Sequence, residues 1–195
     1  MDAGLRQTVN LVLVSAADTE WDERGRLAGG VDLPLSDRGR IQAVALADQL
    51  AGEGLSRVVV GAGQAARQTA EAIAGRLKVS LVQADGLDEI GVGLWEGLTV
   101  EQIRQRSPRL YRQWLDEPTS MCPPQGESVV EAADRLMGAI RRIVAGARGR
   151  RVAVVLGRMA LATARCRLEG AGLDTAWSKV DKEPRWGSLQ GALPD

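Results

Sequence analysis

The chain has 195 residues, of which 45% are hydrophobic and 26% are charged. These are the proportions of an ordinary globular domain, and a chain of this length can bury well over half of the surface that it exposes when unfolded. Lysine plus arginine equals aspartate plus glutamate at 25 each, so no net field attracts nucleic acid or an anionic membrane surface. We therefore expect one domain over residues 1–195, with neither nucleic acid nor a membrane as a partner.

The chain begins with the pattern of a strand, a loop and a helix. Residues 8–15 form a β-branched, apolar run that predicts a buried strand, and a polar loop rich in aspartate and glycine follows over residues 16–32. Ser36 is a favourable N-cap for the next segment. Apolar residues recur there at a helical spacing, at Ile41, Val44, Ala45 and Leu50.

Strand and helix patterns then alternate once more. Residues 57–60 predict a second strand, and residues 65–77 predict a second helix. Residues 79–82 predict a third strand. The inward face of the second helix is expected to hold Ala66, Thr69, Ala70 and Ile73.

The middle of the chain changes character. A loop punctuated by glycine over residues 86–97 leads to short helical stretches near residues 99–106 and 108–115, and then to a proline-rich loop at residues 118–125. We expect residues 86–126 to form a small insertion of helices and loops.

The last third predicts a long helix between the insertion and another strand. Ser128 followed by Glu131 is a capping-box pattern, and the helix it opens runs to about residue 147. Its inward residues are expected to be Val129, Ala132, Leu136, Ile140 and Ile143. Residues 152–156 predict a buried strand, and residues 159–169 a further helix.

The tail from Trp177 favours an edge strand, although Pro184, Gly187 and Gly191 weaken that interpretation. Alternation of strands with helices predicts an α/β fold in three layers, α/β/α, around a mostly parallel central sheet. The apolar runs are too short to cross a bilayer and the start has no signal-peptide pattern, which favours a cytoplasmic protein. Cys122 and Cys166 match no zinc spacing and are interpreted as structural thiols.

Several dispersed motifs resemble the histidine phosphatase superfamily, the phosphoglycerate mutase-like proteins. Residues 11–34 resemble the opening of such proteins, in which a strand ends in R-H-G-E-T and the chain runs through W-N-x-x-G-R-x-Q-G to D-x-P-L-S. The match continues with ARQTAE at 66–71, LDEIGVGLWEGL at 87–98 and GES at 126–128. The motifs keep the order of the family and cover about residues 9 to 170.

The resemblance implies a phosphoryl-transfer site whose reacting groups this chain lacks. In that family a histidine attacks the phosphoryl group, two arginines and a second histidine hold the phosphate, and a glutamate is the general acid. The family's first arginine and first histidine align with Ser15 and Ala16. The second arginine aligns with Ala65 and the second histidine with Gly157, and the chain has no histidine at all.

Four charged residues remain in the predicted pocket. Glu89 aligns with the general acid, Asp18 with a glutamate of the family, and Asp22 with an asparagine. Arg158 follows the position of the lost histidine and could pair with Asp22 or Glu89. The alternative for Arg158 is a solvated arginine in a loop, and the alternative for Glu89 is an ordinary surface carboxylate. The predicted vestigial pocket comprises Ser15, Ala16, Asp18, Asp22, Ala65, Glu89, Gly157 and Arg158.

The leading hypothesis is a catalytically inactive homologue, a pseudoenzyme, that binds or regulates an unknown small molecule or protein. One alternative is altered chemistry in which Asp18, Asp22 and Glu89 bind a metal or act as acid and base. Another is residual phosphatase or mutase activity, with Ser15 as the nucleophile. No cofactor and no metal motif is predicted, and an exposed edge strand could support a homodimer.

Overall fold

The computed structural model describes residues 8–180 and 185–193. Its strands form one five-stranded sheet in the order β3-β2-β4-β1-β5. Neighbouring strands from β3 to β1 run parallel, and β5 pairs antiparallel with β1. The strands are β1 (Thr8–Ser15), β2 (Arg57–Val60), β3 (Ser80–Gln83), β4 (Val152–Leu156) and β5 (Trp186–Ala192).

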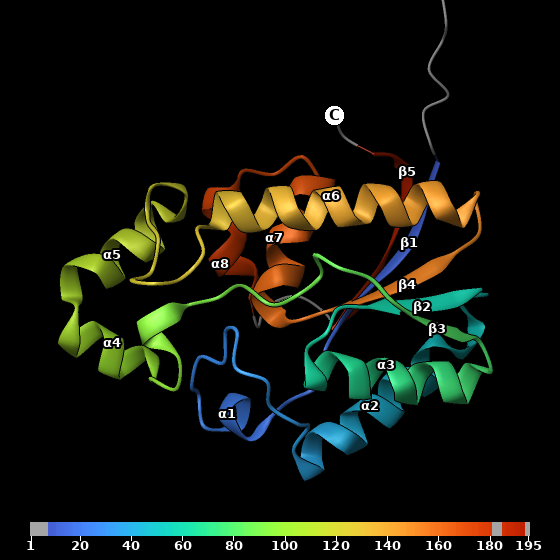
Figure 1. Cartoon of the computed structure of the whole chain (residues 1–195), viewed down its shortest axis with the longest axis horizontal. Coiled ribbons are helices and arrows are strands. Elements are labelled where there is room, and N and C mark those ends of the chain that lie inside the picture. The colour runs from blue at the N-terminus through green and yellow to red at the C-terminus, as the bar shows by residue number, and fades with distance from the viewer. Residues whose placement is uncertain (1–7, 181–184, 194–195) are drawn as a thin grey trace, which may run out of the picture.

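Helices cover both faces of this sheet. They are α1 (Glu20–Glu23), α2 (Asp37–Gln49), α3 (Gln64–Leu77), α4 (Val100–Arg106), α5 (Pro108–Asp116), α6 (Val129–Ala147), α7 (Arg158–Leu168) and α8 (Ala176–Lys179). In Figure 1, α2 and α3 lie on one side of the sheet, and α6 and α7 on the other. The predicted three-layer α/β/α fold with a mostly parallel sheet is confirmed.

The core divides along the alternation of the strands, because successive side chains point to opposite faces. Val12 and Val14 of β1 belong to the cluster shared with α2 and α3. Leu11 and Leu13 belong to the cluster shared with α6 and α7. Within α6, the five residues predicted to face inward are all buried, and its N-terminus carries the predicted capping box of Ser128 and Glu131.

The buried face of α2 differs from the predicted one. Ile41 and Val44 are 72% and 57% exposed, while the buried residues of the helix are Gly39, Ala43, Leu46 and Ala47. A Cβ at Gly39 would lie 1.9 Å from the backbone oxygen of Asp18. The small residues therefore let α2 approach the loop after β1, and this close contact, rather than the bulk of the apolar residues, selects the buried face.

The C-terminal segment forms the predicted edge strand despite its glycines. β5 pairs with β1 from Thr8 opposite Ala192 to Val14 opposite Trp186. Pro184, the proline that weakened the prediction of a strand here, lies outside the described residues. Antiparallel pairing with β1 supplies the hydrogen-bond partners that a strand containing Gly187 and Gly191 needs.

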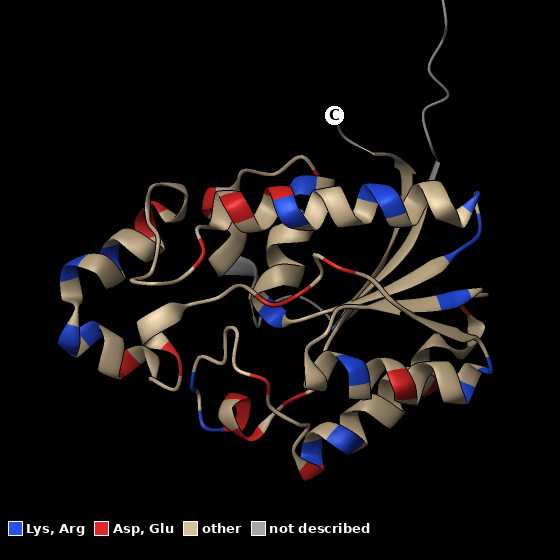
Figure 2. Cartoon of the chain, viewed as in Figure 1, with Lys and Arg blue, Asp and Glu red and all other residues tan. Residues whose placement is uncertain are grey.

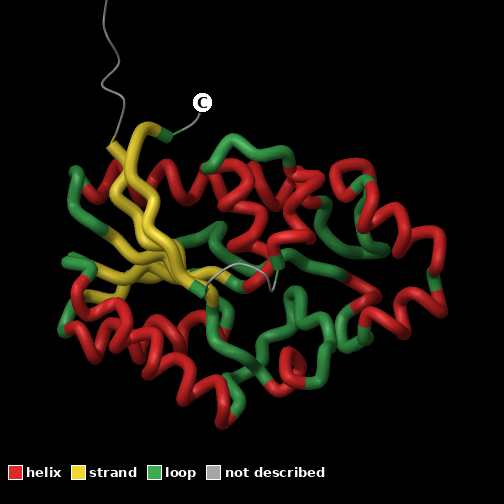
Figure 3. Tube along the Cα trace, turned by 180° about the vertical axis from the view of Figure 1, so that it is seen from behind, coloured by secondary structure: helices red, strands yellow, loops and turns green. Residues whose placement is uncertain are grey.

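The two helices α4 and α5 project beyond the sheet. In Figure 3 the strands gather in one half of the molecule, and helices and loops make up the other half. Trp114 of α5 is buried and packs against Trp95 and Trp177, with ring centroids 5.6 Å and 5.2 Å away. These helices fall within the range predicted for an insertion, residues 86–126. The assignment of the whole chain to a single domain stays a prediction.

Among residues 8–180 and 185–193, no helix has the length and hydropathy needed to cross a membrane. Figure 2 shows basic and acidic residues together along α2, α3 and α6, in keeping with equal numbers of the two kinds in the sequence.

Candidate functional site

The carboxyl ends of the parallel strands open onto one cavity of about 510 Å³. The loops after β1, β2 and β4 line it, together with residues 25–33 and 87–89. In open α/β sheets this edge is the usual place for a ligand. The structure brings six of the eight predicted pocket residues to the cavity: Ala16, Asp22, Ala65, Glu89, Gly157 and Arg158.

Ser15 is the last residue of β1 and Ala16 follows it, but only Ala16 lines the cavity. Ala16 lines the cavity with its methyl group. Ser15 is 5% exposed, and its hydroxyl donates a hydrogen bond to the Ala16 carbonyl oxygen at 3.1 Å. Ser15 is not among the lining residues. Its hydroxyl, considered above as a replacement nucleophile, points at the backbone and away from the cavity.

Asp18 also lies outside the cavity lining. Its carboxylate accepts hydrogen bonds from Arg185 at 2.6 Å and from Gln42 at 2.7 Å. Burial raises the pKa of Asp18, but the hydrogen bonds from Arg185 and Gln42 and the charges of Arg185 and Arg158 outweigh it, so the pKa is lower than the ordinary value. Asp18 is a buried anion that ties the loop after β1 to α2 and to the start of β5.

Asp22 and Arg158 form an ion pair across the cavity. Asp22 Oδ1 lies 3.4 Å from Arg158 Nη1. The other oxygen, Oδ2, accepts hydrogen bonds from the backbone nitrogen and the hydroxyl of Thr19 at 2.7 and 2.6 Å, which completes a capping box at α1. Arg158 therefore reaches the pocket, and of the two partners considered for it, Asp22 is the one that it pairs with.

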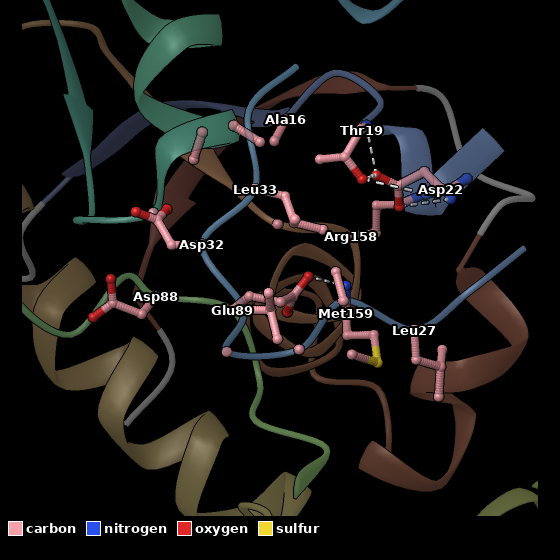
Figure 4. A pocket seen from close by; sticks show the side chains of 18 of the residues that line it. Ala16, Thr19, Asp22, Leu27, Asp32, Leu33, Asp88, Glu89, Arg158 and Met159 are labelled. Atoms are coloured by element: carbon pink, nitrogen blue, oxygen red, sulfur yellow. Dashed lines mark hydrogen bonds and ion pairs between the residues drawn. The ribbon is translucent and has the colours of Figure 1, made fainter. Parts of the chain in front are cut away.

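Glu89 is the most constrained residue of the cavity. Its Oε2 accepts a hydrogen bond from the Met159 backbone nitrogen at 3.0 Å, and its Oε1 accepts from the Ala160 and Ile90 nitrogens at 2.7 Å each. Figure 4 shows this carboxylate directed at the backbone beside Met159. Met159 and Ala160 open α7 after its N-cap residue Gly157, so Glu89 caps that helix from a distant loop.

The pKa of Glu89 reflects its position. Burial raises this pKa above its ordinary value, the hydrogen bonds from Ile90, Ala160 and Met159 oppose the rise, and the charge of Asp22 adds to it. The net shift is upward. Glu89 is half-buried rather than an ordinary surface carboxylate.

The Glu89 carboxylate fills the space that a side chain at position 157 would need. A Cβ at Gly157 would lie 2.3 Å from Glu89 Oε2 and 2.6 Å from its carboxyl carbon. Such approaches are far inside van der Waals contact. Any residue with a side chain at position 157, including a histidine, therefore requires Glu89 to leave the N-terminus of α7.

Two further carboxylates line the cavity that were not selected from the sequence. Asp32 Oδ1 accepts a hydrogen bond from the backbone nitrogen of Gln64, the first residue of α3, at 2.5 Å. Asp88 Oδ1 accepts from the Ala62 nitrogen at 3.0 Å. Asp32 fits the D-x-P-L-S motif, which was a signal for it. Nothing in the local sequence links Asp88 to Ala62, 26 residues away.

Two other charged residues were not among the predicted pocket residues: Arg26, which fits the G-R pair of the family's motif, and Arg185, for which no motif in the sequence was a signal. Arg26 lines the cavity and donates to the Gly97 carbonyl oxygen at 2.5 Å. Arg185 donates to the Ala16 carbonyl oxygen at 3.1 Å and to Asp18. Within residues 8–180 and 185–193, no group of three or more histidine, cysteine or acidic side chains is placed to hold a metal ion.

Comparison with known proteins places this geometry in a family. Residues 11–182 match the model of the histidine phosphatase superfamily (branch 1). Phosphoserine phosphatase 1 of Hydrogenobacter thermophilus is 31% identical over 170 residues, which are 87% of this chain and 81% of the relative.

Solved structures agree with the sequence match. A mycobacterial glucosyl-3-phosphoglycerate phosphatase, described as a complex with VO3, is 26% identical with a TM-score of 0.82 and covers 91% of this chain and 88% of its own. YhfR of Bacillus stearothermophilus is 30% identical with a TM-score of 0.80, covering 87% of this chain and 84% of its own. The chain therefore belongs to the histidine phosphatase superfamily.

Proposed function

We propose that this protein is a catalytically inactive member of its superfamily that uses the cavity to bind a ligand. The observation that carries the proposal is the side chain of Ala16. A methyl group stands directly after β1, where the resemblance places the nucleophilic histidine, and the chain contains no histidine. Without a nucleophile no phosphoenzyme forms.

No described side chain near Ala16 replaces that nucleophile. The Ser15 hydroxyl donates to a backbone carbonyl, and a serine needs an adjacent base to become reactive. The nearest candidates for a base, Asp22 and Glu89, are already committed to Arg158 and to the N-terminus of α7.

The charge of the cavity also disfavours phosphate. The two clamp arginines of the family correspond to Ser15 and Ala65, while Asp22 and Glu89 line the space. Two like charges 4 Å apart repel by about 4 kcal/mol at the effective dielectric of a partly buried site. A phosphate in this cavity would meet that repulsion without the two arginines that the resemblance implies, and Arg158 is already paired with Asp22.

The alternative of altered chemistry needs Asp18, Asp22 and Glu89 to act on one substrate. The geometry does not favour it, because Asp18 lies outside the cavity lining and is held by Arg185 and Gln42. Only Asp22 and Glu89 face the cavity, and each already accepts several hydrogen bonds.

A phosphatase assay tests the proposal. The purified protein is incubated with p-nitrophenyl phosphate and with phosphoserine, with and without a chelator, beside an active member of the superfamily as a positive control. We expect no turnover above the buffer blank. Turnover that co-purifies with the protein and disappears when it is unfolded would contradict the proposal.

A further inference from the structure

The cavity is large enough for a small molecule and is mainly apolar. Its volume of about 510 Å³ falls within the range of about 300–1,000 Å³ typical of ligand sites. Apolar side chains project into it from several segments, including Leu27, Ala28, Val31, Leu33, Val100 and Met159. A ligand with an apolar body would gain hydrophobic stabilisation here.

The places where an anion would bind are already taken by carboxylates of the protein. Backbone N–H groups at a helix N-terminus are ready-made anion sites. At α7 the Glu89 carboxylate accepts those of Met159 and Ala160, and at α3 the Asp32 carboxylate accepts that of Gln64. An anionic ligand would have to displace these internal anions.

The remaining charges of the cavity lead to the same conclusion. Among the described residues, four carboxylates line it, those of Asp22, Asp32, Asp88 and Glu89, against the two guanidinium groups of Arg26 and Arg158. Arg158 is paired with Asp22, and Arg26 donates to a backbone carbonyl. In the view of Figure 4, Leu33 and Met159 lie between Asp32 and Asp88 on one side and Asp22 on the other.

We infer that the ligand is a small, mainly apolar molecule that carries no anionic group. The inference rests on the proposed binding function and goes beyond it by naming the ligand class. Apolar contacts with the lining supply the affinity, and the internal carboxylates exclude phosphate and carboxylate groups through repulsion and through their occupation of the helix N-termini.

Fluorescence titration with the neutral probe N-phenylnaphthylamine tests the inference. We expect saturable binding with enhanced emission. Replacing Ala65, which lines the cavity, by leucine (Ala65→Leu) reduces the open volume and should weaken binding at least about tenfold. Ala28→Leu fills the cavity from a different loop and keeps the test valid if the first variant fails to fold. Ala45→Leu, an exposed position of α2 outside the cavity, is the matched control and should bind as the unaltered chain does.

Displacement of the probe tests the exclusion of anions. Naphthylmethanol and naphthyl phosphate share one aromatic body and differ in charge, and we expect the alcohol to displace the probe at a concentration at least about tenfold lower. Equal or stronger displacement by the phosphate would overturn the ligand class. So would an absence of saturable binding, or binding that neither filled variant weakens.

The same experiment separates the two proposals. Release of fluorescent naphthol from naphthyl phosphate would refute catalytic inactivity, whatever the probe does. Failure of the probe to bind, with no naphthol released, would overturn the ligand class alone.

Discussion

The position of Glu89 has two opposite effects on the charged form of its carboxyl group. Three backbone N–H groups donate to it, while burial and the charge of Asp22 raise its pKa. In the resemblance this residue is the general acid. Here its oxygens accept hydrogen bonds at α7, so its role in this chain is to complete a helix N-terminus.

This assignment predicts the pH dependence of a Glu89→Gln variant. The unfolded chain deprotonates Glu89 at its ordinary pKa, whereas the folded chain retains the proton to a higher pH. The contribution of Glu89 is therefore fully present below the unfolded pKa and is lost as pH rises through the folded pKa, by about 1.4 kcal/mol for each unit between the two values. Glutamine does not titrate, so the variant should gain stability relative to the unaltered chain as pH rises from the unfolded pKa through the folded pKa of Glu89.

Urea unfolding across that range measures the difference. Asp18→Asn is the control with the opposite sign, because the pKa of Asp18 is lowered and its contribution is lost as pH falls through the folded pKa. The difference in stability between the unaltered chain and this control should narrow at low pH. If the free energy of unfolding of Glu89→Gln differs from that of the unaltered chain by the same amount at every pH, the raised pKa of Glu89 is refuted.

At the scale of elements, the junction between β4 and α7 places Gly157 directly against Glu89. Gly157 is the N-cap of α7 and has φ −64° and ψ 170°, a backbone conformation that alanine adopts without strain. The absence of a side chain at this position leaves the room in which Glu89 caps the helix. The absence of a side chain at position 157 and the position of the Glu89 carboxylate therefore depend on each other.

A double-mutant cycle tests this coupling. Gly157→Ala should destabilise the protein by about 1–3 kcal/mol, because its Cβ overlaps the Glu89 carboxylate. In a Glu89→Ala background the overlaps with the carboxyl group disappear and only a tight contact of 3.1 Å with the Cβ of residue 89 remains, so Gly157→Ala should cost less than about 1 kcal/mol. Urea unfolding of the four proteins gives the coupling free energy.

Gly63→Ala is the matched control for this cycle. Gly63 is the N-cap of α3 at the equivalent junction after β2, and a Cβ there meets nothing within 4 Å. Its replacement should cost little in either background. Equal costs of Gly157→Ala with and without Glu89 would show that the two positions are independent.

Elements were predictable from the sequence where local pattern decides them. Ser128 with Glu131 places the start of α6, and the apolar run at β4 coincides with the strand as folded. The face of α2 was not predictable, because it depends on contact of Gly39 with a loop that follows another strand. The periodicity of apolar residues along a helix indicates only their size and spacing. A close approach between two backbones depends on the tertiary structure.

At the scale of the whole molecule, the candidate site was predictable only as far as aligned motifs reach. The motifs identified Ala16, Glu89 and Gly157, and the fold brings their loops to one edge of the sheet. The contacts of Asp88 with Ala62 and of Arg185 with Asp18 join segments 26 and 167 residues apart. No periodicity signals such pairs, so these long-range contacts emerged only from the folded arrangement.

If the lost phosphate site is a property of the whole cavity, one substitution will not restore it. Ala16→His alone supplies a nucleophile but leaves Glu89 on α7 and no clamp, so we expect neither turnover of p-nitrophenyl phosphate nor a thermal shift with orthovanadate. Combining it with Ser15→Arg, Ala65→Arg and Gly157→His restores the cations and forces Glu89 off the helix N-terminus. That fourfold variant should be stabilised by orthovanadate by about 2–4 °C for each kcal/mol of ligand binding. Circular dichroism establishes that it folds. Turnover by Ala16→His alone would show that the missing nucleophile is the whole barrier. A folded fourfold variant with no orthovanadate shift would show that the barrier to phosphate binding lies outside these four positions.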